Sequence, residues 1–401
     1  MVSKCLFWWG VALIKSNFLI TKNLPIFSSL FVNGLAGGFV WPYLPILLSE
    51  RGLAANRIGI VLGTASLLIL VFRIPLGRLL DRSQLPGRWV RLALLLPFPI
   101  TVYLTINTRN PLWLAGAVFL LNLARLPFLP MGLSALKRLS EEGKKPFSPL
   151  IFVGTHHLFL GILGMLAGGM IGLSGLHKTL TLVILLVLFG SLPLIWQTDR
   201  VHSRPHPNPP PSRWTLDRTE KLVLSSFFLL HLVNAPLLPF TELYMKLHTP
   251  HPDWIPWIAG IAELTMVITA IVLSRVRMTM GSAGIMIVAS GILAIRMCLY
   301  AMSPTAVGVL WISILDGITS GIFWMGGIGW VALRTQGRGT FNQLSGLLDI
   351  VVITGGAAGT LVFGWAVSRW GFAGAAGRLA GLNLLSPLFL ILAGRKAWSP
   401  H

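Results

Sequence analysis

Several ionisable side chains lie inside long apolar runs of this sequence, where a charge is costly unless it meets a partner or a cavity. Glu263, Arg296 and Asp316 suggest chemistry, because a guanidinium stays charged whereas one of two neighbouring carboxylates exchanges a proton near neutral pH. We hypothesise that Glu263 and Asp316 share a proton-coupling cluster with Arg296, which holds one acid ionised while the other exchanges protons. The alternative is a static ion pair that braces helices.

Two further charged residues are candidates for proton coupling or for binding a carboxylate. Asp349 is a fourth candidate for proton coupling, although Asn342 and Gln343 precede it on the same predicted helix and would equally form a hydrogen-bonding rib. Arg125 follows a run of apolar residues, where a desolvated guanidinium suits either a carboxylate ligand or a buried acid.

Other polar and aromatic residues are candidates for lining a substrate cavity. His156 and His157 point about 100° apart on a helix, so at most one faces the cavity, as a proton relay or as an ordinary satisfied polar residue. We assign His156 to the cavity, together with Asn33 and His231. Trp324 either stacks on a ligand or anchors the chain at a membrane interface.

The composition explains why these charges stand out. Of the 401 residues, 54% are hydrophobic and 11% charged, with a mean hydropathy of +0.76, too few charges for a soluble surface. The net charge of +20 comes in short bursts between apolar runs, which argues against a nucleic-acid partner. Cys5 and Cys298 stand far apart with no His cluster, so we expect no disulfide, no metal site and no cofactor.

Apolar runs of the length that crosses a bilayer recur along the chain. Six precede a proline-rich polar linker at 198–219, and six follow it. The predicted runs are 24–49, 57–80, 89–107, 111–136, 149–174 and 178–197, then 220–247, 254–275, 282–301, 305–333, 341–368 and 376–394. The chain is therefore predicted to be an all-α membrane protein of twelve transmembrane helices. Its two six-helix bundles are 1–197, which includes an interfacial N-terminal segment, and 220–401.

The orientation follows from the positive residues. Most of the 32 Lys and Arg fall at the termini, in the linker and in the loops on that side, and such loops stay in the cytoplasm. We expect a multi-pass protein of the cytoplasmic (inner) membrane with both termini and the linker cytoplasmic.

The loop after the second run carries a recognisable motif. It reads Gly77-Arg78-Leu79-Leu80-Asp81-Arg82 and continues with Gly87-Arg88 and Arg91, which resembles the G-x-L-x-D-R-x-G-R-R loop of the Major Facilitator Superfamily. In that family the Asp and its basic partners form a latch that is closed in one access state. The resemblance assigns a conformational latch to Gly77, Asp81, Arg82, Gly87 and Arg88, and the alternative is an ordinary positive loop.

A narrower resemblance concerns one branch of the superfamily, the phenylpropionate permease and nucleoside or oligosaccharide proton symporters. The segment 34–63 resembles the first hairpin of this branch at Pro42, Pro45, Gly52, Ile58 and Gly59. The other matching positions are Arg73, Glu263, Arg296 and Leu315-Asp316-Gly317. The branch has a histidine where this chain has Asp316.

The resemblance implies a secondary transporter in which two bundles rock about a central solute site, and we expect proton-coupled symport of a small organic solute. The alternatives are a proton-driven efflux exporter and a non-transporting membrane receptor. An enzyme is not expected, because no nucleophile, acid and base converge. The expected partners are the solute, protons and the lipid bilayer, and the expected state is a monomer.

Overall fold

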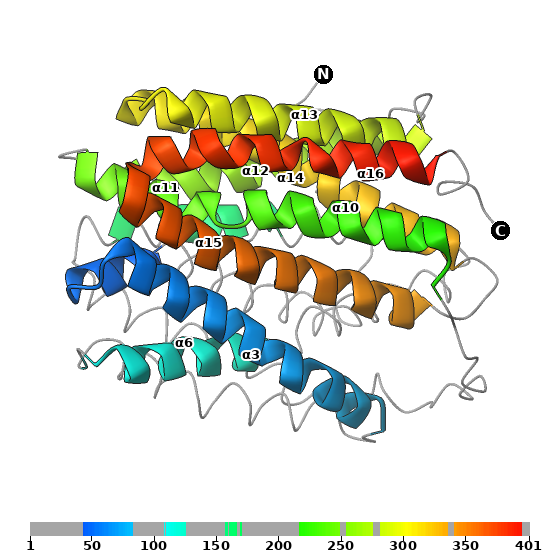
Figure 1. Ribbon diagram of the computed structural model, residues 1–401, viewed down its shortest axis with the longest axis horizontal. Coiled ribbons are helices and arrows are strands. Elements are labelled where there is room, and N and C mark those ends of the chain that lie inside the picture. The colour runs from blue at the N-terminus through cyan, green and yellow to red at the C-terminus, as the bar shows by residue number, and fades with distance from the viewer. Residues whose placement is uncertain are drawn as a thin grey trace, which may run out of the picture.

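The computed structural model of the protein describes residues 43–82, 108, 110–125, 157–158, 160–166, 169–170, 216–248, 254–275, 281–335 and 341–394. These residues form long helices joined by short turns, and no strand occurs among them, so the described part is all-α as predicted (Figure 1). The labelled helices are α3 (Ala55–Arg82), α6 (Pro111–Arg125), α10 (Arg218–Asn234), α11 (Leu237–His248), α12 (Ile255–Arg275), α13 (Gly281–Ala301), α14 (Ala306–Arg334), α15 (Phe341–Asn383) and α16 (Leu385–Ala393).

Six segments among the described residues are long and apolar enough to cross a membrane. The last of them, Leu344–Ala393, has 50 residues and would reach about 75 Å as one straight helix, far more than the ~30 Å hydrocarbon core. It is interrupted at Gly371, whose φ of 72° is accessible to glycine at little cost, and the chain turns back there (Figure 1). This segment therefore accounts for two of the predicted runs, 341–368 and 376–394.

The predicted run 220–247 is not one continuous helix. α10 ends at Asn234 and α11 begins at Leu237, with a turn at Ala235 and Pro236. Proline has no amide hydrogen and clashes with the preceding turn, so Pro236 and Pro239 together remove two helical hydrogen bonds at this point. The break leaves the side chain of Asn234 at a helix end in the middle of the span.

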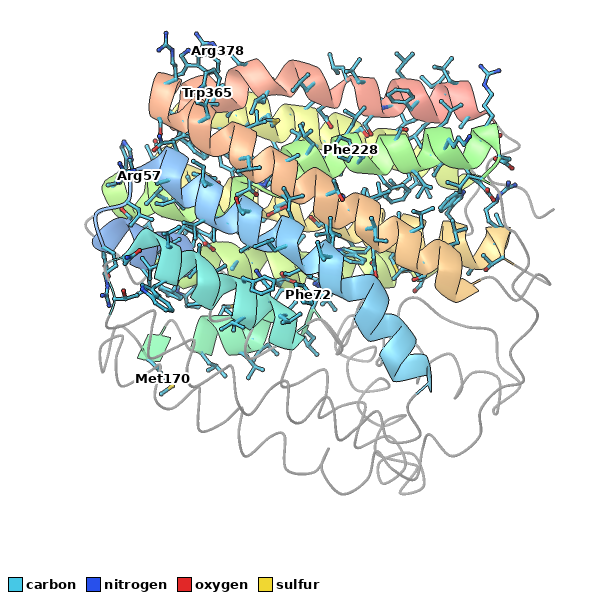
Figure 2. The ribbon with its side chains drawn as sticks, turned by 60° about the horizontal axis from the view of Figure 1, so that its bottom comes forward. Arg57, Phe72, Met170, Phe228, Trp365 and Arg378 are labelled. Carbon is cyan, nitrogen blue, oxygen red and sulfur yellow. The ribbon has the colours of Figure 1, made fainter. Side chains whose placement is uncertain are left out.

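Large apolar side chains point outward along the helices. Phe72 on α3 and Trp365 on α15 are 43% and 54% exposed and lie on the outer surface (Figure 2). Trp113, Trp257 and Trp311 are also exposed. A surface of this kind is unfavourable in water and suits a lipid environment, as the predicted spans require.

The first half of the chain packs against the second half through α3 and α15. Both views show these two helices close together at one end and diverging toward the other (Figures 1 and 2). At the close end, a Cβ added to Gly59 would lie 2.7 Å from the carbonyl oxygen of Thr360, and one added to Gly364 would lie 2.9 Å from the Cα of Gly59. Only glycine permits this approach of the two backbones.

We call the region where these helices meet the Glu50 end. There the Lys246 ammonium pairs with the Glu50 carboxylate at 2.7 Å, and the Asn56 amide donates to Ser368 Oγ at 2.8 Å. Each contact joins the two halves of the chain. In the described residues, the Glu50 end is thus closed by direct contact between the halves.

The opposite end of the second half is fixed by a different set of contacts. Asp217 caps α10 by accepting from the Glu220 amide, and the Glu220 side chain accepts from the Asp217 amide. Arg334, at the end of α14, forms ion pairs with both acids. We call this region the Arg334 end; its contacts lie within one half and join the two termini of neighbouring helices.

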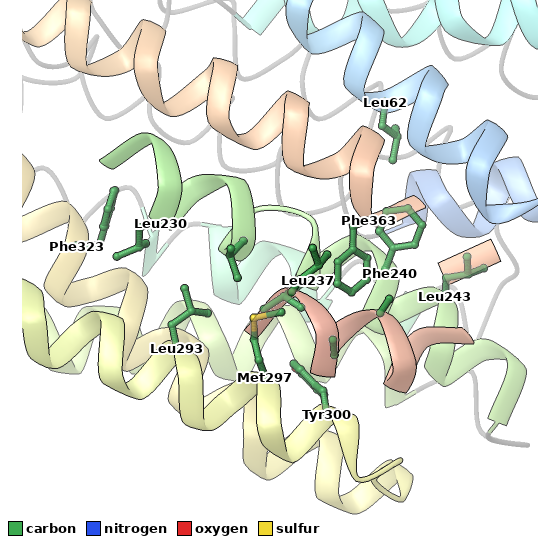
Figure 3. Packing of buried hydrophobic residues seen from close by; sticks show 14 of the residues in the cluster. Leu62, Leu230, Leu237, Phe240, Leu243, Leu293, Met297, Tyr300, Phe323 and Phe363 are labelled. Atoms are coloured by element: carbon green, nitrogen blue, oxygen red, sulfur yellow. The ribbon is translucent and has the colours of Figure 1, made fainter. Parts of the chain in front are cut away.

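The core of the second half is a continuous apolar cluster that surrounds the buried charges. Phe240 on α11 and Phe363 on α15 are fully buried with ring centroids 5.4 Å apart, and Leu62 reaches the same cluster from α3 (Figure 3). Tyr300 and Met297 line it on the α13 side (Figure 3). Close packing of this kind holds the helices, and hence the charged residues on them, in fixed positions.

Candidate functional site

The first element of the candidate site is an ion pair between α13 and α14. Arg296 Nη1 donates to Asp316 Oδ1 at 2.6 Å, and the two residues are 1% and 8% exposed. A buried pair of this kind is stable only if other groups satisfy the remaining donors and acceptors. The structure brings Arg296 and Asp316, two of the three predicted cluster residues, into contact, and their part in proton coupling stays a prediction.

Two polar side chains add hydrogen bonds to this pair, while Arg296 Nε is buried without a hydrogen-bond partner among the described residues. Arg296 Nη1 also donates to Asn234 Oδ1 at 2.7 Å, and Ser320 Oγ donates to Asp316 Oδ1 at 3.2 Å. Asn234 Nδ2 in turn donates to Ser320 Oγ at 3.3 Å, which closes a ring of four residues from three helices. Sequence reasoning missed Asn234 and Ser320; the position of Asn234 just before the Pro236 break and the i, i+4 spacing of Ser320 from Asp316 were the available signals.

The second element is an ion pair that joins the two halves of the chain. His157 Nδ1 lies 2.6 Å from Glu263 Oε2, and the side chains are 6% and 19% exposed. The helix that carries His157 approaches α12 closely, since a Cβ added to Gly161 would lie 3.0 Å from the Glu263 Cβ. Glycine at this position allows the histidine and the carboxylate to meet across the interface.

The predicted cluster is therefore two adjacent pairs rather than three residues around one arginine. Arg296 is bonded to Asp316, whereas Glu263 is bonded to His157. The charge of Glu263 still acts on Asp316. A change in the charge of either carboxyl group is thus felt by the other pair.

The remaining cavity candidates have diverse positions. The Trp324 ring lies 6.1 Å from the His157 ring between centroids, so this tryptophan belongs to the same neighbourhood. His231 is buried on α10 with its ring 4.1 Å from that of Phe323. Asp349 is half-buried on α15.

Several predicted residues lie outside the described residues: Asn33, His156, Gly87 and Arg88. Others are described by their backbone alone. Arg125 is the last residue of α6, and Gly77, Asp81 and Arg82 occupy the last turns of α3, so the first part of the predicted latch is helical. Their roles stay predictions.

One buried acid was missed by the sequence analysis. Glu242 on α11 is 0% exposed, and neither of its carboxylate oxygens has a hydrogen-bond partner among the described residues. It was overlooked because the predicted run ended at 247, which places Glu242 near a loop. The apolar neighbours Leu243 and Met245 and the preceding Phe240 were the signals that this acid is inside the span.

The comparisons with known proteins agree with this architecture. The model of the Major Facilitator Superfamily matches residues 26–249. Two uncharacterized MFS-type transporters of Mycobacterium tuberculosis, from strains CDC 1551 / Oshkosh and ATCC 25618 / H37Rv, are each 30% identical over 200 residues, 47% of this chain and 47% of the relative. The match thus spans about half the length of these curated relatives.

Three solved transporters have the same fold. The nucleoside transporter NupG is 14% identical with a TM-score of 0.71 and covers 93% of this chain and 98% of its own. A bacterial homolog of the human lysosomal transporter Spinster, inward-facing and occupied, is 13% identical with a TM-score of 0.71 over 96% and 98%. The human organic anion transporter MFSD10 is 15% identical with a TM-score of 0.65 over 91% and 98%.

These likenesses agree with the motif in segment 77–91 and with the outward-facing apolar side chains. The family match covers more than half of the chain, and the fold likeness extends over nearly all of it. The chain belongs to the Major Facilitator Superfamily, and its long apolar helices are those of a multi-pass membrane protein.

Proposed function

We propose that the protein is a proton-coupled symporter of a small organic solute that works by alternating access. The observation that carries this proposal is the His157–Glu263 pair, because it joins the two halves of the chain through two titratable groups. A transporter whose halves rock about a central site must break such a pair in one of its states. Protonation of either partner changes the strength of the pair and thereby the balance between states.

The proposed sequence of events begins with the pair intact and the Glu50 end closed. A proton on the Glu263 carboxylate removes the negative charge that holds His157, which weakens the link between the halves. Solute bound beside Trp324 provides the contacts that favour one access state over the other. Coupling requires that the proton and the solute each bind the two states with different affinity.

The Arg296–Asp316 pair has a different proposed role. Its guanidinium is already engaged by Asp316 and Asn234, so it sets the electrostatic potential around Glu263 rather than moving with the halves. A solute that carries a carboxylate would need another cation, and we propose Arg125 for this contact. Asp349 remains a secondary candidate for proton transfer.

The proposed frame is the predicted one: bundles 1–197 and 220–401, the linker 198–219 and both termini in the cytoplasm, and a monomer in the inner membrane. In this orientation the Arg334 end faces the cytoplasm, because Arg334 pairs with Asp217 next to the linker. The closed Glu50 end then faces outward. We infer that the structure represents an access state sealed toward the outside.

The test is transport by purified protein in liposomes with an external pH indicator. The vesicles are given pooled nucleosides, aromatic acids and oligosaccharides in turn, and protein-free vesicles serve as the control. Solute-dependent alkalinisation of the medium is the expected result for one pool. Solute binding without uptake would indicate a receptor, and solute extrusion against an inward proton gradient would indicate an exporter; either outcome contradicts symport.

A further inference from the structure

Glu242 is the most completely buried acid of the described residues that has no partner. Its side chain is 0% exposed, both oxygens lack a hydrogen-bond donor, and no described basic residue forms an ion pair with it. The other in-span acids differ: Asp316 has Arg296 and Ser320, and Glu263 has His157. Glu242 therefore has no role in the pairs described above.

An ionised carboxylate in such a position is strongly disfavoured. Removing a charge from water is costly, and nothing around Glu242 compensates it with a hydrogen bond or an opposite charge. A carboxylic acid loses far less on burial, since it is neutral. The geometry is therefore compatible with a protonated Glu242 and not with an ionised one.

The titratable groups that face Glu242 add to this preference. Asp316 on α14 and Tyr43 on the segment 43–50 interact electrostatically with it, and Tyr43 comes from the other half of the chain. The nearby guanidinium of Arg296 is committed to Asp316 and lies 5.6 Å from the Tyr300 ring. A negative charge at Glu242 would thus face another acid, while the local cation is already paired.

The helix that carries Glu242 also forms the closed end of the molecule. One turn after Glu242, Lys246 pairs with Glu50 of the first half, and two residues before it, Phe240 packs against Phe363. A Cβ added to Gly364, where α15 meets α3, would lie 3.1 Å from the Phe240 ring. Glu242 thus lies on the helix that carries the Lys246–Glu50 contact between the two halves at the Glu50 end.

We propose that Glu242 is a second proton-binding site of the transporter, which takes up a proton when the Glu50 end opens to water and retains it when that end closes. On uptake a hydronium ion gives its proton to the carboxylate, so that an O–H bond forms and a water molecule is left. On release this O–H bond breaks and a water molecule accepts the proton as hydronium. The role in transport rests on the proposed symport function. The protonation itself is a property of the closed structure.

Infrared spectroscopy of the purified protein in lipid nanodiscs at neutral pH tests the protonation without any solute. The wild type should show a carboxylic acid C=O stretching band, and Glu242→Gln should lose one acid's share of that band. The matched control is Asp217→Asn, which removes a half-exposed, ion-paired carboxylate at the Arg334 end and should leave the band unchanged. An unchanged band in folded Glu242→Gln protein would overturn the proposal. Loss of the wild-type band on addition of sodium chloride would also overturn it, because the carboxylate would then bind Na⁺ in place of a proton.

The link to the closed end is tested by exchange into heavy water. The band should shift slowly in the wild type and at least tenfold faster in Gly59→Ala, whose added methyl group separates α3 from α15. Equal exchange rates would overturn the gating part. The infrared result is independent of the proposed function. If the Glu242 band is present but the protein shows no proton-driven transport, symport is refuted and the protonation of Glu242 stands. If the protein shows proton-driven transport but no Glu242 band, the Glu242 site is refuted and symport stands.

Discussion

Two ion pairs of the same length differ in which parts of the chain they connect. Arg296–Asp316 and His157–Glu263 both measure 2.6 Å between nitrogen and oxygen. The first lies within the second half of the chain and is completed by Asn234. The second joins the two halves.

The surroundings of the two pairs explain what each is suited to do. The Arg296–Asp316 pair is almost fully buried and has additional hydrogen bonds, so breaking this pair would leave two unpaired charges in an apolar interior. Glu263 keeps 19% of its side chain exposed, and its partner His157 belongs to the other half of the chain. We propose that the pair within a half acts as a brace, which holds helices together, and that the pair between halves acts as a switch.

The largest effect is expected when the Arg296–Asp316 pair is removed. Arg296→Gln leaves the Asp316 carboxylate buried without its cation, and we expect a loss of about 3–5 kcal/mol of stability and most transport. Thermal unfolding in detergent measures the first effect. The double variant Arg296→Gln with Asp316→Asn should recover most of the stability, and a double variant as unstable as the single one would contradict the assignment as a paired brace.

Removing the switch should have a smaller effect on folding and a large one on coupling. His157→Gln keeps a hydrogen-bonding side chain but cannot become positive, so a charged hydrogen bond of about 1.5–3 kcal/mol between the halves is lost. We expect a smaller loss of thermal stability than in Arg296→Gln, and weak proton-driven uptake in liposomes. His248→Gln is the matched control, because this histidine bonds only a backbone carbonyl on its own helix. Equal uptake in both variants would show that the pair is not a switch.

A variant that forces the two halves apart tests whether the contact between α3 and α15 closes the Glu50 end. Gly59→Ala places a methyl group 2.7 Å from the Thr360 carbonyl oxygen and should open the Glu50 end. The variant Thr360→Cys, at a position that is buried in the closed structure, should then react several-fold faster with a membrane-impermeant maleimide in a background without Cys5 and Cys298. Gly116→Ala is the control, since a Cβ there meets nothing within 4 Å. Unchanged reactivity in Gly59→Ala would mean that α3 and α15 do not seal this end.

The smallest effect is expected at the surface link between the halves. Lys246→Ala removes a pair whose side chains are 26% and 49% exposed, and such pairs contribute about 0–1 kcal/mol. We expect thermal stability to change little and the maximal uptake rate to change less than in His157→Gln. A loss of uptake as large as in His157→Gln would show that the link at the surface, rather than the buried pair, controls the halves.

Much of the architecture was predictable because lipid imposes strong rules on composition. Long apolar runs predicted α12, α13 and α14 to within one residue at each end, and the buried charges Arg296, Asp316 and Glu263 stood out against them. The break between α10 and α11 was signalled by Pro236 but was not predicted. A proline shows where a helix weakens and not whether the surrounding packing restores it.

The partners of the charges were not predictable in the same way. Charge type alone favoured Arg296 for both acids, whereas the structure pairs Glu263 with His157, and sequence reasoning had assigned His156 to the cavity. The rotation of a helix decides which of two adjacent histidines meets its neighbour, and apolar periodicity fixes that rotation only loosely. Glu242 was missed because the predicted run 220–247 ends shortly after it, although its apolar neighbours indicated a position inside the span.

The most direct test of the account is a comparison of exchange and coupling in Glu263→Gln. This variant keeps the size of the side chain and a hydrogen bond to His157 but cannot bind and release a proton. Liposomes preloaded with the solute pool that the wild type transports should still exchange labelled solute with the medium, while solute-dependent alkalinisation and uphill uptake disappear. Uphill uptake with alkalinisation equal to the wild type would contradict the claim that this pair couples protons to solute.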